Sequence, residues 1–268
     1  MSQSQQILDL LRRYESRNIT FIEEDGSWPI VWSRANGEFV WDADGRRYVD
    51  LTAAFGVANT GHANPHVVRA AKRQIARLPH AMGDVHPHPL KAQLARTLSR
   101  ITFERWTQNQ HGKTVFCNSG FEAVEVALKT AILATGRPGV LVFEGAYHGL
   151  GYGALAVTHR ELFRAPFVKQ LGGFACFVPF PAANSEQKPD RSHERDTDAV
   201  VVEKTITAMD RMRRKHAIGA VLIEPIQGRG GVRIPVPGFL GVLRSWCDKT
   251  GVLLLLDEIY TGFGRTGT

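Results

Sequence analysis

From about residue 112 onward, short apolar runs alternate with stretches that have helical spacing, and this alternation limits the fold more than any other feature of the sequence. Short apolar runs between turn signals have the length of buried strands rather than of helices. Strands that alternate with helices predict an α/β domain with a mainly parallel sheet. The expected strands are 114–117, 140–143, 220–223 and 252–256. Ligands of such sheets bind beyond the carboxyl ends of the strands, so the residues that follow each strand are candidates for function.

The first of these junctions leads from the run 114–117 into a predicted helix through Ser119 and Gly120. The apolar residues of this helix are spaced three and four apart: Val124, Ala127, Leu128, Ala131 and Ile132. Free amides and the positive dipole end at a helix N-terminus favour a phosphate group. Alternatively, Asn118 or Ser119 only caps the helix, and the residues favour neither interpretation. Further along the helix, Glu125 is expected to pair with Lys129, four residues on.

Two further junctions carry polar or aromatic side chains. The run 140–143 is followed by a glycine-rich loop that contains Tyr147 and His148. The tyrosine ring either stacks on a flat cofactor or packs on the core, and the histidine is a candidate base or ligand. The run 220–223 ends in Glu224, and a carboxylate in that position needs a basic partner or serves a site, because unpaired burial is costly.

The last run, 252–256, ends in Asp257, and the residues that follow suggest three functions. An ATPase would need a phosphate loop, whose only candidate, 112–114, has Thr107 where the first glycine belongs and leads into a strand. A dinucleotide fingerprint would need its glycines directly after the strand and at the start of a helix, and those in 262–267 do not fit. The third interpretation, an acid that contacts an electron-deficient cofactor ring, remains.

A phosphate cradle at Ser119, a stacking ring at Tyr147 and a carboxylate at Asp257 complement a phosphorylated, flat, basic heterocycle. Pyridoxal 5'-phosphate has these properties. A carboxylate beside the ring nitrogen favours the protonated ring, typically by about 1 to 3 pKa units. Protonation makes the ring an electron sink for a carbanion at the substrate carbon.

The N-terminal part of the sequence has a different pattern. The segment 38–51 alternates around an Asp-Ala-Asp-Gly turn and predicts an antiparallel hairpin, followed by helices near 64–78 and 89–101. We therefore expect residues 1–60 to be the N-terminal segment of a small α+β domain. Residues 61–268 are expected to form a large cofactor-binding domain that is incomplete at its C-terminus.

Composition and charge exclude several classes of protein. The net charge is +7, but the basic residues are dispersed, and the densest cluster, 211–216, closes a predicted helix, so no nucleic-acid partner is expected. No apolar run reaches the roughly 20 residues that span a bilayer, and no signal pattern is present, so the protein is expected to be cytoplasmic without a membrane partner. The three cysteines are scattered, and Pro65 between His62 and His66 disfavours a helical pair of ligands, so no metal site is expected. The polar stretch 183–198 predicts a surface loop.

Taken together, the motifs closely resemble the class III, or ω-amino acid, aminotransferases of the pyridoxal-phosphate fold type I group. The matching segments occur in the family's order over nearly the whole chain: 42–50, 61–65, 118–125, 147–149, 224–228 and 257–267. The resemblance implies an aspartate aminotransferase-like large domain with three layers, α/β/α. It also implies a cofactor, pyridoxal 5'-phosphate, a homodimer, and transamination between an amine or amino acid and a keto acid.

The resemblance also implies a role for each matching residue. The phosphate would be bound at Ser119, Gly120 and Phe121, and the ring would meet Tyr147 with His148 in the same site. Two catalytic residues are expected: Asp257 at the pyridine nitrogen, and Glu224 close to the cofactor and the substrate pocket. Near the ring hydroxyl the family often has Gln where this chain has Tyr260.

The family's Schiff-base lysine lies beyond the Asp-Glu strand, and the last lysine of this chain, Lys249, precedes it. Two hypotheses follow. Either the sequence is the N-terminal portion of an aminotransferase, or it is a truncated, non-catalytic remnant that acts as a cofactor-binding or dimerisation partner. Aminomutases, racemases and decarboxylases of the same family are further alternatives. The chain by itself is expected to be inactive and to bind the cofactor weakly.

Overall fold

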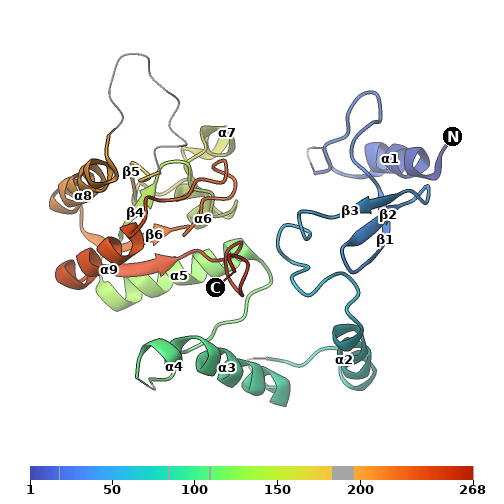
Figure 1. The fold of residues 1–268 in the computed structure, drawn as a ribbon, viewed down its shortest axis with the longest axis horizontal. Coiled ribbons are helices and arrows are strands. Elements are labelled where there is room, and N and C mark those ends of the chain that lie inside the picture. The colour runs from blue at the N-terminus through green and yellow to red at the C-terminus, as the bar shows by residue number, and fades with distance from the viewer. Residues whose placement is uncertain (18, 84, 109, 183–195, 268) are drawn as a thin grey trace. The chain divides into compact units, whose positions relative to one another are not determined.

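The computed structural model describes residues 1–268 except 18, 84, 109, 183–195 and 268 (Figure 1). It divides into two compact units, Met1–Thr97 and Leu98–Thr268, which are described separately. The predicted surface loop falls mainly on 183–195, outside the described residues. The domain boundary expected after residue 60 stays a prediction.

The N-terminal unit contains one helix, α1 (Gln3–Tyr14), before a three-stranded antiparallel sheet of β1 (Trp32–Asn36), β2 (Phe39–Asp42) and β3 (Arg47–Val49). This sheet confirms the predicted hairpin. Its turn is held by the buried carboxylate of Asp42, which accepts hydrogen bonds from the amides of Asp44 and Arg46 at 3.0 and 2.8 Å and from the hydroxyl of Tyr48 at 2.9 Å. The two predicted helices follow as α2 (Pro65–Arg77) and α3 (Pro89–Ile101), of which α3 crosses the division between the units.

The C-terminal unit is built on a parallel sheet in the order β5-β4-β6-β7. Its strands are β4 (Gly139–Phe143), β5 (Ala175–Val178), β6 (Ile218–Ile223) and β7 (Leu253–Leu256). Three predicted strands are thus confirmed. The expected strand at 114–117 is wrong, because this segment pairs with no strand in the described part of the chain.

Helices cover both faces of this sheet (Figure 1). The side chains of Val140 and Val142 pack with those of α5 (Gly120–Thr135) and α6 (Tyr152–Ala156). The alternate residues Leu141 and Phe143 pack with α8 (Asp198–Lys215) and α9 (Phe239–Thr250). Since successive side chains of a strand point to opposite faces, β4 contributes to both cores. The predicted three-layer α/β/α architecture is confirmed.

Three short helices complete the unit: α4 (Phe103–Trp106), α7 (Glu161–Arg164) and the 3-10 helix η1 (Ala165–Phe167). The densest basic cluster lies in the last turn of α8, as predicted, where cations suit the negative end of the helix dipole. In the ranges that the structure describes, no helix combines the length and the apolar character needed to cross a membrane.

Candidate functional site

The carboxyl ends of the parallel strands surround a cavity of about 370 Å³. It is lined by Ser119, Gly120, Phe121, Tyr147, His148, Gly149, Leu150, Glu224, Ile226, Asp257, Ile259 and Tyr260. Every residue that the sequence assigned to the site is among them. The sheet explains this convergence, because β4, β6 and β7 are adjacent and parallel, so the segments that follow them meet at one edge. The role of each residue stays a prediction.

The N-terminus of α5 forms one wall of the cavity. The hydroxyl of Ser119 accepts a hydrogen bond from the amide of Glu122 at 3.4 Å, and the carboxylate of Glu122 accepts one from the amide of Asn118 at 2.7 Å. Ser119 is therefore the N-cap, as one interpretation of the sequence proposed. Capping leaves the first two helical amides, those of Gly120 and Phe121, with no acceptor among the described residues. Both therefore remain available to an anion.

The glycine-rich loop after β4 lies directly against the first turns of α5. A Cβ atom at Gly149 would overlap the Cβ of Phe121, and one at Gly151 would lie 2.6 Å from the ring of Phe121. The loop is also tied to the helix, because the amide of Ala154 donates to the carboxylate of Glu125 at 2.9 Å. The expected ion pair of Glu125 with Lys129 does not occur among the described residues. The glycines permit the close approach of this loop to the N-terminal turns of α5.

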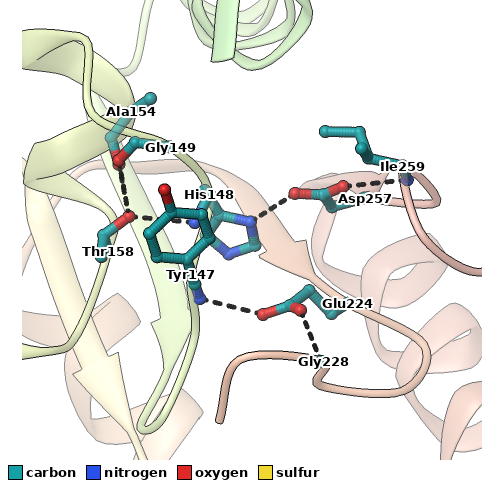
Figure 2. Close-up of polar contacts among 9 residues, drawn as sticks. All are labelled: Tyr147, His148, Gly149, Ala154, Thr158, Glu224, Gly228, Asp257 and Ile259. Atoms are coloured by element: carbon teal, nitrogen blue, oxygen red, sulfur yellow. Dashed lines mark hydrogen bonds and ion pairs between the residues drawn. The ribbon is translucent and has the colours of Figure 1, made fainter. Parts of the chain in front are cut away.

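A buried histidine holds the aspartate at the end of β7. Nδ1 of His148 lies 2.7 Å from Oδ2 of Asp257, and both side chains are almost fully buried. The other oxygen of this carboxylate accepts the amide of Ile259 at 3.2 Å. His148 is fixed in turn because its amide donates to the hydroxyl of Thr158 at 2.9 Å (Figure 2). Asp257 therefore has little freedom to rotate.

The second ring nitrogen of His148, Nε2, is buried and has no hydrogen-bond partner in the described part of the chain. Buried polar atoms without a partner are rare in native proteins and call for an explanation such as a functional role or a bound molecule. The sequence placed His148 in the site but missed its contact with Asp257. The two residues are 109 positions apart, and only the order of the strands brings them together.

Glu224 joins two loops of the site rather than a basic side chain. One carboxylate oxygen accepts the amide of Tyr147 at 2.9 Å and the other accepts the amide of Gly228 at 3.0 Å (Figure 2). Burial raises the pKa of Glu224, and the two amide hydrogen bonds act in the opposite direction. In this structure Glu224 is a positioning residue that fixes the backbone on both sides of the cavity. Its predicted catalytic role remains a prediction.

Aromatic rings and an arginine lie beside Glu224, whose two hydrogen bonds to the amides of Tyr147 and Gly228 we call the Glu224 clamp. The ring of Tyr147 makes an edge contact with Phe163, with 5.6 Å between ring centroids. The guanidinium carbon of Arg229 lies 4.5 Å from the centroid of the Tyr147 ring. Tyr260 packs so closely on Gly228 that a Cβ there would lie 2.6 Å from the tyrosine ring. Sequence reasoning did not single out Arg229, because nothing in its local pattern predicts a contact with a residue 82 positions earlier.

The cysteines take no part in the cavity. Cys176 and Cys247 are buried, and burial raises the pKa of the Cys247 thiol to about 11, while Cys117 is half-buried. Over the described ranges, no group of three or more histidine, cysteine, aspartate or glutamate side chains is arranged to hold a metal ion.

Comparison with protein families gives a match to the model of "Aminotransferase class-III" over residues 21–268. Two curated relatives, the acetylornithine aminotransferases of Methanosarcina mazei and Methanopyrus kandleri, are each 38% identical to this chain. The first alignment covers 91% of this chain and 53% of the relative, and the second covers 90% and 54%. The chain thus spans about half the length of the curated relatives it matches.

Solved structures give the same result for the fold. An (S)-enantioselective omega-transaminase from Thermomicrobium roseum superposes with a TM-score of 0.85 at 27% identity, over 100% of this chain and 59% of that one. The taurine:2-oxoglutarate aminotransferase from Bifidobacterium kashiwanohense, solved in complex with PLP and glutamate, superposes with a TM-score of 0.85 at 26% identity, over 100% and 58%. The fold type I prediction is confirmed.

The Glu224 clamp predicts the effect of replacing its carboxylate. In Glu224→Gln only one side-chain oxygen remains, so one of the two buried amides loses its acceptor. The free energy of unfolding should fall by about 1–3 kcal/mol, measured by urea titration of the recombinant protein. The exposed Glu203→Gln on α8 is the matched control and should change it by less than about 0.5 kcal/mol.

The pH dependence gives a second readout of the same substitution. Because the pKa of Glu224 is raised in the folded state, its contribution to stability is largest below the ordinary carboxyl pKa and declines as the pH rises through the raised value. Glu224→Gln should remove this part of the pH profile. A variant as stable as the control, with an unchanged profile, would show that the clamp is unimportant.

Proposed function

Because this chain belongs to the class III aminotransferase family, we propose that the protein it represents is a pyridoxal-phosphate-dependent transaminase. The reaction would move an amino group from an amine or amino acid to a keto acid. One observation carries the proposal: a helix N-terminus with two open amides, an aromatic ring and a buried, oriented carboxylate line one cavity. The printed names of the relatives support the same reaction class.

The residues of the cavity fit the cofactor. The amides of Gly120 and Phe121 would hold the phosphate, and Tyr147 offers a flat face to the ring. The buried Nε2 of His148, which has no partner in the described residues, is consistent with a site completed by a bound molecule. When bound, pyridoxal phosphate supplies a protonated pyridine ring that withdraws electrons from the substrate carbon.

The chain's own residues would prepare that ring. Asp257 would hold a proton at the pyridine nitrogen, because a nearby carboxylate favours the charged form of a base. His148 would keep the carboxylate oriented through its 2.7 Å contact. Glu224 would hold the backbone of Tyr147 and thereby fix the position of the tyrosine ring in the cavity. Tyr260 would face the ring hydroxyl, in the place where the family often has Gln.

The resemblance to the family supports two further proposals, a homodimer and a complete protein in which residues 1–60 belong to the small domain and 61–268 to the large one. We also propose a cytoplasmic location, for which the sequence patterns described above are the support. Aminomutase, racemase and decarboxylase activities of the same family are the alternatives to transamination, and analysis of the reaction product distinguishes them.

The cavity lining in the described residues contains no lysine. We therefore propose that the 268-residue chain by itself binds the cofactor without a covalent bond and does not transaminate. The coding sequence after residue 268 distinguishes a longer enzyme from the alternative, a stand-alone remnant. An open frame with a lysine in a Ser/Thr-Lys context supports the longer enzyme, and a stop codon supports the remnant.

Substitution of the buried aspartate tests the proposed reaction. In the complete protein, Asp257→Asn should lower turnover by about 100-fold or more, because it removes the charge that stabilises the electron-withdrawing ring. Circular dichroism should show an intact fold. Asp248→Asn, at an exposed ion pair with Arg244, is the control and should retain turnover. Near-normal turnover in Asp257→Asn would mean that the ring contact is misassigned.

Borohydride reduction tests the cavity of the chain by itself. The 268-residue chain is mixed with pyridoxal phosphate, reduced and digested, and its peptides are analysed by mass spectrometry. We expect no stoichiometric adduct at a single lysine, because no lysine lines the described cavity. One specific, fully modified lysine would contradict this proposal.

A further inference from the structure

Gln227 is a fully buried polar side chain to which the proposed function gives no role. Its Nε2 donates a hydrogen bond to the carbonyl oxygen of Glu144 at 2.9 Å, and its Oε1 accepts one from Nη1 of Arg233 at 3.3 Å. A buried amide is costly without such partners, and here both ends of the amide have one. Gln227 is not among the described residues that line the cavity. Any effect that it has on the cavity therefore passes through another residue.

The carbonyl group that Gln227 holds begins the turn between β4 and Tyr147. The next residue, Gly145, has a φ of +86°, and a glycine by itself does not fix the direction in which the chain continues. Nη1 of Arg233 donates to the same carbonyl oxygen of Glu144 at 3.1 Å. A Cβ at Gly145 would lie 2.7 Å from Nη1 of Arg233 and 2.7 Å from Oε1 of Gln227. The direction of the turn is therefore set by two side chains of the loop after β6.

The same loop holds the other end of the turn. The amide of Tyr147 donates to the carboxylate of Glu224 at 2.9 Å (Figure 2). Within the loop, the backbones of Gln227 and Arg233 exchange two hydrogen bonds of 3.0 Å, which keep its base closed. The hydrogen bond to Glu224 alone would leave the peptide group after Glu144 free to rotate. With both ends held, the backbone of Tyr147 has one orientation, and its ring lines the cavity.

We propose that Gln227, supported by Arg233, is a positioning residue for the cofactor: through the carbonyl of Glu144 it sets the orientation in which the Tyr147 ring meets a flat ring bound in the cavity. This inference rests on the proposed transaminase function and adds a positioning residue to it. The expected effect is selective. Loss of Gln227 weakens binding of the ring and leaves binding of the phosphate unchanged, because the two side-chain hydrogen bonds of Gln227 in the described chain go to Glu144 and Arg233 and not to α5.

The test measures ligand binding by calorimetry on the complete protein after removal of its cofactor. Pyridoxine 5'-phosphate has the ring and the phosphate of the cofactor but forms no imine, whereas inorganic phosphate has the anion alone. Gln227→Met should raise the Kd of pyridoxine 5'-phosphate by about 3- to 10-fold, as expected for a lost aromatic stack, and that of inorganic phosphate by less than about 2-fold. Gln170→Met, at an exposed glutamine of the same unit, is the matched control and should change neither.

Two further variants show whether Gln227 acts through the tyrosine ring. In a Tyr147→Leu background the stack is already lost, so Gln227→Met should raise the Kd of pyridoxine 5'-phosphate by less than about 2-fold, because residues that act as a unit are not additive. Arg233→Met removes the other donor to the carbonyl of Glu144 from a half-buried position. It should produce the same selective loss, and it tests the inference even if Gln227→Met does not fold.

Three results would overturn the positioning role. They are equal losses for the two ligands, a loss of the same size in the Tyr147→Leu background, and pyridoxine 5'-phosphate binding that neither Gln227→Met nor Arg233→Met changes. A separate assay of transamination by the wild-type protein decides the proposed function. If the selective loss is found but no amino group is transferred, the transaminase proposal fails and the positioning role stands. If amino groups are transferred but the loss is not selective, the positioning role alone fails.

Discussion

The buried contact between His148 and Asp257 is the interaction on which the site depends. It joins the loop after β4 to the end of β7, across the edge at which β6 delivers Glu224. A buried carboxylate without a partner costs several kcal/mol, so the histidine stabilises Asp257 where the cavity needs it. The same contact fixes which way the carboxylate faces. A negative charge in this position is suited to an electron-poor ring that carries a proton.

The remaining contacts keep the walls of the cavity in place around this pair. Glu224 uses both carboxylate oxygens on backbone amides and so joins the loop of Tyr147 to the loop of Gly228. The glycine-rich loop can lie on α5 only because Gly149 and Gly151 have no side chain. Contacts of this kind hold charge and donors in fixed positions, so that they need not move during a reaction.

Much of the fold and the membership of the site could be predicted from the sequence, because both depend on local patterns. The runs 140–143, 220–223 and 252–256 are continuously apolar, and the functional residues follow them directly. Which runs pair as strands could not be predicted in this way. The apolar run 114–117 was expected to be a strand but pairs with no strand in the described residues. The short β5, directly before Pro179, was not predicted and is stabilised by its pairing with β4. The partners of Asp257, Glu224 and Tyr147 are distant in sequence and depend on the strand order.

The most direct test of the central claim is a crystal structure of the complete protein with pyridoxal phosphate. The account predicts phosphate oxygens within about 3 Å of the amide nitrogens of Gly120 and Phe121, and the pyridine nitrogen within about 3 Å of the Asp257 carboxylate. His148 should keep its contact with that carboxylate. A phosphate bound elsewhere, or a ring nitrogen that faces away from Asp257, would contradict the account.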